Sequence, residues 1–92
     1  MMKASVYRAL DRLNELEKKM DRLNDKAYDK YQEGKIKASE HYERDADDIQ
    51  KEINGMVSCL KILGLNAWRE CGYDTNYEGR WHIPLDDIET VC

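Results

Sequence analysis

The sequence is 92 residues long, with 37% charged and 41% hydrophobic residues and a formal net charge of -4 at pH 7. This length suits one domain at the small end of what buries its own core, and the apolar share excludes a disordered chain. Because the longest apolar run, around residues 56–60, is far shorter than the roughly 20 residues of a bilayer span, and the first residues lack the apolar core of a signal peptide, we exclude a membrane protein and expect a cytoplasmic one.

The first predicted element is a long helix over residues 1–33. Its apolar residues recur at alternating intervals of three and four positions, a heptad spacing that aligns them along one side of a helix. Gly34 marks the end of this helix, since glycine adopts the left-handed conformation found there without steric cost. The stripe consists of Val6, Ala9, Leu13, Leu16, Met20, Leu23 and Ala27.

A turn over residues 34–37 and a second helix over residues 38–63 follow. The second helix carries a heptad stripe of its own, and Gly64 directly behind it is again suited to a helix end. Its stripe consists of Tyr42, Ala46, Ile49, Ile53, Met56, Leu60 and Leu63.

Two heptad stripes joined by a short turn are expected to face each other. We therefore predict a long antiparallel helical hairpin with coiled-coil packing. In the predicted register, Val6 lies opposite Leu63 at the open end of this hairpin, and Ala27 lies opposite Tyr42 near the turn.

The remaining residues, 64–92, are predicted to form a small β-hairpin and a tail. Trp81, Ile83 and Leu85 alternate with residues of other types, and this period of two is typical of a strand. Residues 65–71 provide the partner strand.

Residues 74–79 form the predicted loop between these strands, and residues 86–91 a turn or short helix. Pro84 places the second strand at an edge, because proline cannot donate a hydrogen bond within a sheet. The predicted fold is thus mostly α (α+β), in one domain over residues 1–92.

The histidines and cysteines indicate no catalytic or metal site. The chain has three cysteines, an odd number, and no export signal, so we expect reduced thiols at Cys59, Cys71 and Cys92. Together with His82 they contain no close pair of the kind that holds zinc, and neither His82 nor His41 neighbours a nucleophile. We expect no cofactor, no metal and no enzymatic activity.

Charges of opposite sign follow each other along the first helix. Acidic residues recur at every fourth position from Glu17 to Glu33, with basic residues directly behind them. This interleaving predicts a solvent-exposed charged face. A ridge that binds nucleic-acid phosphates is the alternative, but the adjacent carboxylates would neutralise much of its field, so direct nucleic-acid binding is not favoured. The basic residues are Lys18, Arg22, Lys26 and Lys30.

Carboxylates on the first half of the second helix are candidates for partner binding. Carboxylates along a rod can dock on a basic groove or imitate a nucleic-acid backbone, and the alternative is a solvated face. They are Glu40, Glu43, Asp45, Asp47, Asp48 and Glu52.

Tyrosines gather near the turn in the predicted hairpin, where Tyr28, Tyr31 and Tyr42 come together with His41. Aromatic anchors are common in interfaces, so these residues are candidates for a recognition patch. The alternative is that they close the end of the helical bundle.

Three apolar residues lie off the main stripes, namely Leu10, Val57 and Ile62. Two helices cannot enclose both flanks of their contact, so these residues are candidates for a second seam that packs against another copy. We therefore expect a homodimer that forms a four-helix bundle.

These features predict a non-enzymatic protein–protein interaction module that acts by occlusion. In size, acidity and layout, the chain resembles the small accessory proteins of bacteriophages and prophages, some of which inhibit host defence systems. A second hypothesis is thus an inhibitor whose carboxylates imitate nucleic acid in a defence nuclease such as a CRISPR effector, with a nucleic-acid-processing complex as its partner. A small nucleic-acid-binding helical protein is the third hypothesis.

Overall fold

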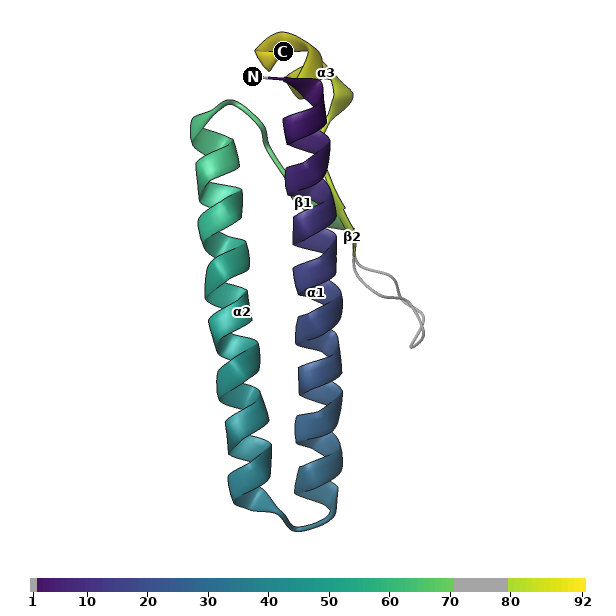
Figure 1. The fold of residues 1–92 in the computed structure, drawn as a ribbon, viewed down its shortest axis with the longest axis vertical. Coiled ribbons are helices and arrows are strands. Elements are labelled where there is room, and N and C mark those ends of the chain that lie inside the picture. The colour runs from purple at the N-terminus through teal and green to yellow at the C-terminus, as the bar shows by residue number, and fades with distance from the viewer. Residues whose placement is uncertain (1, 71–79) are drawn as a thin grey trace.

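Two long antiparallel helices make up most of the protein. The computed structural model describes residues 2–70 and 80–92. Helices α1 (Lys3–Gln32) and α2 (Ile36–Ile62) lie side by side, and the molecule measures 51 × 25 × 17 Å (Figure 1). The predicted helical hairpin with a small C-terminal β-hairpin is confirmed. We call the end with the turn between α1 and α2 the closed end, and the opposite end the open end.

Helix α1 ends at the closed end in a left-handed glycine, as predicted. Gly34 has a φ of 78°, and its N–H donates to the carbonyl of Tyr31 at 3.0 Å. The N–H of Lys35 donates to the carbonyl of Lys30 at 2.9 Å. This pair of hydrogen bonds is a Schellman motif, which satisfies carbonyl groups that the end of a helix leaves free.

Helix α2 ends at the open end in the same motif. Gly64 has a φ of 88°, its N–H donates to Lys61 at 3.0 Å, and the N–H of Leu65 donates to Leu60 at 2.8 Å. Both leucines are buried, so the apolar contact that commonly accompanies this motif joins the core here.

The core lies along the contact between the two helices and continues under the C-terminal segment. Leu63 is 48% exposed, so the predicted layer of Val6 and Leu63 is wrong on the side of α2. The helix ends at Ile62, and the chain turns inward only at Leu65, which is fully buried. The core cluster is Val6, Leu13, Leu16, Ile49, Ile53, Leu60, Leu65, Ile83 and Ile88.

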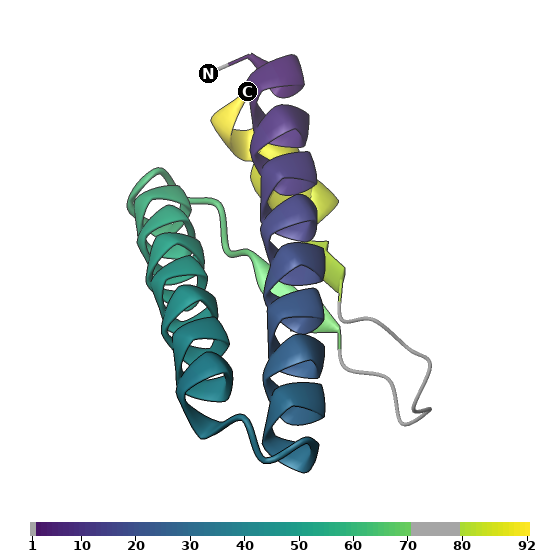
Figure 2. The ribbon, with the colours of Figure 1, turned by 60° about the horizontal axis from the view of Figure 1, so that its bottom comes forward.

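The C-terminal segment forms a short antiparallel sheet. Strand β1 (Trp68–Glu70) pairs with β2 (Arg80–His82), and Arg69 lies opposite Trp81. Both strands are shorter than predicted, and the predicted connecting loop at 74–79 lies outside the described residues. The sheet packs along α1 in the half nearer the open end. Apart from α2, no described element packs on the half of α1 nearer the closed end (Figures 1 and 2).

A short helix, α3 (Leu85–Val91), lies at the open end beside the start of α1 (Figures 1 and 2). Leu85 is 66% exposed, so the predicted continuation of the strand through this residue is wrong. Pro84 has an extended backbone (φ -56°, ψ 133°) and its carbonyl accepts the N–H of Ile88 at 3.2 Å, which begins the helix. Ile83 and Ile88 are buried and attach this segment to the core.

Candidate functional site

A shallow groove of about 340 Å³ lies between the two helices near the closed end. Its floor is formed by Ala27 and Ser39, which are both buried. The hydroxyl of Ser39 donates to the carbonyl of Ala27 at 2.8 Å and so ties the two helices together. Because both side chains are small, the helices approach closely and leave space above them.

The walls of the groove are aromatic on one side and acidic on the other. Tyr28 and Tyr31 come from α1 and are 65% and 61% exposed. Glu43 comes from α2, and Asn24 of α1 completes the lining. The structure thus brings together three of the residues that the sequence indicated for partner binding, namely the two tyrosines and Glu43.

Tyr42 lies apart from these tyrosines. It is half-buried and does not line the groove. The ammonium of Lys26 lies 5.9 Å from its ring centroid, and the ring of His41 packs against it at 6.0 Å. Tyr42 therefore helps to pack α1 against α2, and the tyrosines at the closed end do not form one patch.

The six candidate carboxylates of α2 fall on two flanks of the helix, because it has 3.6 residues per turn. On one flank, a carboxylate oxygen of Asp45 lies 3.6 Å from the imidazole of His41, and Glu52 forms an ion pair with Arg12 of α1 at 3.4 Å. That flank comprises Asp45, Asp48 and Glu52, and the flank on the side of the groove comprises Glu40, Glu43 and Asp47.

Two of the three carboxylates on the side of the groove, Glu43 and Asp47, have no ion-pair partner in the described part of the chain. Glu43 and Asp47 are both exposed, and no ion pair links either to another described residue. Glu40 shares a second hollow, of about 370 Å³, with the basic residues Lys37, His41 and Arg44. Unpaired negative charge is thus found next to the tyrosines, on Glu43 and Asp47.

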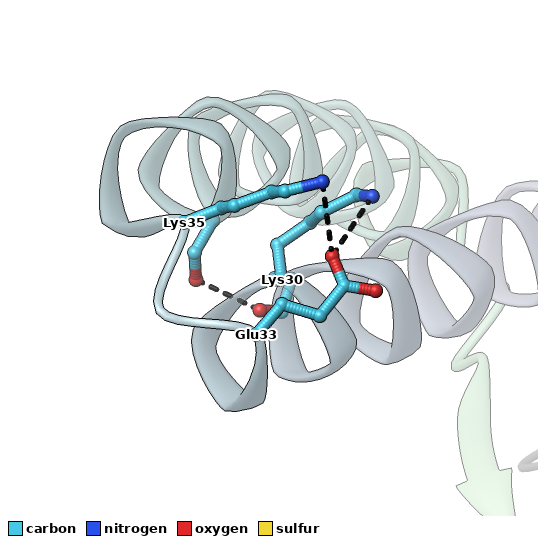
Figure 3. A network of polar contacts seen from close by, with 5 residues as sticks. Lys30, Glu33 and Lys35 are labelled. Atoms are coloured by element: carbon cyan, nitrogen blue, oxygen red, sulfur yellow. Dashed lines mark hydrogen bonds and ion pairs between the residues drawn. The ribbon is translucent and has the colours of Figure 1, made fainter.

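Basic residues at the turn are already paired. The ammonium groups of Lys30 and Lys35 converge on one carboxylate oxygen of Glu33, at 3.3 and 3.4 Å (Figure 3). The hydrogen bond from Lys30, with the charges of both lysines, holds the pKa of Glu33 below its usual value. These two lysines therefore neutralise Glu33 instead of the groove.

Glu17 is a buried residue that the sequence analysis placed on the solvent face, and this prediction is wrong. It is 1% exposed and forms an ion pair with Arg69 of β1. The indole N–H of Trp81 donates to it at 3.4 Å, and the backbone N–H of Trp81 donates to Asn14 at 2.7 Å. These contacts attach the sheet to α1, which explains why a carboxylate can be buried there.

One line of residues on α1 connects this attachment to the groove. Six positions alternate by three and four, as the core stripe does, and so share a side of the helix. The first two contact the sheet, and the last three line the groove beyond it. Because the line mixes amide, acidic and aromatic side chains, the spacing of apolar residues does not predict it. Its members are Asn14, Glu17, Asp21, Asn24, Tyr28 and Tyr31.

The residues indicated for self-association do not share one environment. Leu10 and Val57 are half-buried and pack against the core, whereas Ile62 is 84% exposed. Leu63 beside it is also about half exposed. Of the three residues, only Ile62 thus remains uncovered, at the open end of α2.

Other chemistry is sparse among the residues that the structure describes. They contain no group of three histidine, cysteine or acidic side chains that could hold a metal ion, and none of their helices is long and apolar enough to cross a membrane. Cys59 and Cys92 are exposed free thiols, and Cys71 lies outside the described residues. No protein-family model, curated protein or solved structure matches this chain.

Proposed function

We propose that this protein is a non-enzymatic binding module that holds a protein partner in the groove at its closed end and acts by occlusion. The observation that carries this proposal is the exposure of Tyr28 and Tyr31 above a buried floor. Tyrosine is enriched at interface cores, since its ring offers a large contact area with few rotatable bonds. Within this proposal the protein acts in the cytoplasm.

The scaffold beneath the groove supports this role. Both walls stand on helices, which place side chains more rigidly than loops do. The bond from Ser39 to Ala27 fixes the two helices at the floor. A preorganised surface binds more tightly because less conformational freedom is lost on association.

Self-association belongs to the proposal as well, at the opposite end of the molecule. Ile62 and Leu63 are adjacent exposed apolar residues at the open end of α2, whereas the groove lies near the closed end. A homodimer formed through this end would leave both grooves accessible. Light scattering of the wild type and of an Ile62→Glu variant tests it: the wild type should have the mass of a dimer and the variant that of a monomer, and a monomeric wild type would refute the dimer.

The distribution of charge gives less support to the two alternative functions. An acidic imitation of nucleic acid requires a continuous row of carboxylates, whereas those of α2 occupy two flanks and Glu52 pairs with Arg12. A nucleic-acid-binding ridge requires unpaired cationic groups, but Lys30, one of its four basic residues, pairs with Glu33. Binding in the tyrosine groove requires neither a continuous row of carboxylates nor a row of unpaired cations.

The test is capture of partners from a bacterial lysate by the tagged protein, analysed by mass spectrometry. The wild type is compared with the double variant Tyr28→Ala/Tyr31→Ala and with Tyr7→Ala. Tyr7 is the matched control, because it lies on the same helix at the open end and is 45% exposed. We expect a partner that the wild type and Tyr7→Ala retain and the double variant loses. Equal capture by all three folded proteins would refute the proposal.

A further inference from the structure

The polar groups that line the groove are hydrogen-bond acceptors or can act as acceptors. Glu43 is a carboxylate and offers no donor when ionised, and it is the one charged residue in the lining. The hydroxyl of Ser39 has its proton committed to the carbonyl of Ala27, so its free lone pairs are acceptors. Asn24 adds an amide oxygen. Such a lining favours a bound group that supplies hydrogen-bond donors.

The electrostatic surroundings favour a positively charged occupant. Neither a lysine nor an arginine lines the groove, and the two lysines at the turn are held by Glu33. Asp47 lies one turn beyond Glu43 on the same flank of α2 and is exposed, which adds negative charge nearby. Neighbouring carboxylates attract a cation and raise its rate of association.

The aromatic wall favours the same occupant. The faces of tyrosine rings attract cations, most often the guanidinium group of arginine, which can also stack on a ring. The aliphatic stem of such a side chain packs on apolar surface while its charged end reaches a carboxylate. A neutral apolar side chain would use the tyrosines but would leave the acceptors of Glu43 and Ser39 without donors.

We infer that the groove recognises an arginine side chain on the protein partner, with the guanidinium group between the tyrosine wall and Glu43. This inference rests on the proposed function and names the chemistry of the partner. Arginine fits better than lysine, because its five donors can reach Glu43, Ser39 and Asn24 from one planar group. A short exposed segment with an arginine at its centre meets these requirements.

The test is a nuclear magnetic resonance titration of the isotope-labelled full chain with two probes. One probe is the blocked tripeptide acetyl-Ala-Arg-Ala-amide, and the other replaces its arginine with citrulline, which is neutral and nearly the same shape. The backbone amide signals of Tyr28, Tyr31 and Ser39 should shift with the arginine probe at millimolar concentration. The citrulline probe should bind about fivefold more weakly, since it lacks the charge that both the rings and Glu43 attract.

Two variants localise the interaction. Glu43→Gln should weaken binding of the arginine probe to the level of the citrulline probe, whereas Asp47→Asn, outside the groove on the same flank, should change it less than twofold. Equal binding of the two probes, no shift in the groove, or equal effects of the two variants would overturn the inference. If Tyr28→Ala/Tyr31→Ala loses the partner while the two probes bind the wild type equally, the groove is a binding site but arginine is not what it recognises.

Discussion

The two helices of the hairpin end in the same backbone motif, yet the residue that follows the motif is buried at one end and exposed at the other. Behind Gly64, the next residue is Leu65, which is fully buried and continues the core. Behind Gly34, the next residue is Lys35, which stays at the surface and pairs with Glu33. The glycine therefore determines only where a helix stops, and the residue after it determines whether the chain enters the core.

The same contrast holds along α1. Near the open end, Asn14 and Glu17 contact the sheet and are covered by it. Near the closed end, the same side of α1 presents Tyr28 and Tyr31, and the described chain leaves them exposed. Among the described residues, the sheet thus covers this side of α1 near the open end only, and the exposed part near the closed end is where we propose that a partner binds.

The largest expected effect belongs to the half that stabilises the fold, when a core leucine of the open end is truncated. Leu13 is fully buried in the core cluster, so Leu13→Ala should lower the free energy of unfolding by about 3 kcal/mol through lost burial and a residual cavity. Leu85 is 66% exposed, and Leu85→Ala should change it by less than about 0.5 kcal/mol. Urea denaturation followed by circular dichroism measures both. Equal losses would mean that the open end is not packed as described.

Removal of the cation beside Glu17 should have the next largest effect. Arg69→Ala leaves a buried carboxylate without its partner and should cost about 1–3 kcal/mol, less than for a fully buried pair because Arg69 is 39% exposed. Adding Glu17→Gln to this variant removes the charge and should restore part of the loss. The same denaturation experiment checks this, and a double variant less stable than Arg69→Ala would show that the charge of Glu17 does not cause the cost.

The helical hairpin was predictable because its signal is local and repeated. Each stripe places seven apolar residues on one side of a helix, and the glycines at 34 and 64 mark both ends. The short final helix and the antiparallel strands were also predictable in kind. Their bounds were not, because three paired residues per strand give little periodicity to read.

The candidate site was predictable only in part, because it depends on contacts between distant segments. Tyr28, Tyr31 and Glu43 were identified as binding candidates from their types, but their assembly depends on the small residues Ala27 and Ser39 between the helices. The charge pattern predicted an exposed Glu17, since its partners lie more than fifty positions later in the chain. Periodicity on one helix cannot reveal such a partner.

The floor of the groove offers a smaller test at the closed end. Ser39→Ala removes the buried hydrogen bond to Ala27 and should destabilise the protein by about 1 kcal/mol. Ser58 of α2 is exposed and is the matched control, since Ser58→Ala gains helix propensity without losing a buried bond and should be neutral or slightly stabilising. Thermal and urea unfolding distinguish the two. An unchanged free energy of unfolding in Ser39→Ala would show that the hydrogen bond from Ser39 to Ala27 does not stabilise the closed end.

The smallest effect is expected at the turn, where Lys30 and Lys35 meet Glu33. The pKa of Glu33 is lower in the folded than in the unfolded protein, chiefly through the hydrogen bond from Lys30. Its contribution to stability is therefore present above the unfolded-state pKa and is lost as the pH falls through the folded-state value. Glu33→Gln should lower the melting temperature slightly at neutral pH, and this difference from the wild type should vanish in acid.

The control for this turn is Glu40→Gln, because Glu40 is exposed and no ion pair links it to another described residue. At neutral pH, Glu40→Gln should change the melting temperature less than Glu33→Gln does. Added salt should also reduce the effect of Glu33→Gln, since exposed charges are screened at high ionic strength. If the melting temperatures of Glu33→Gln and the wild type still differ in acid, the ion pairs of Glu33 do not cause the difference. The substitution would then act on the backbone of the turn at Gly34.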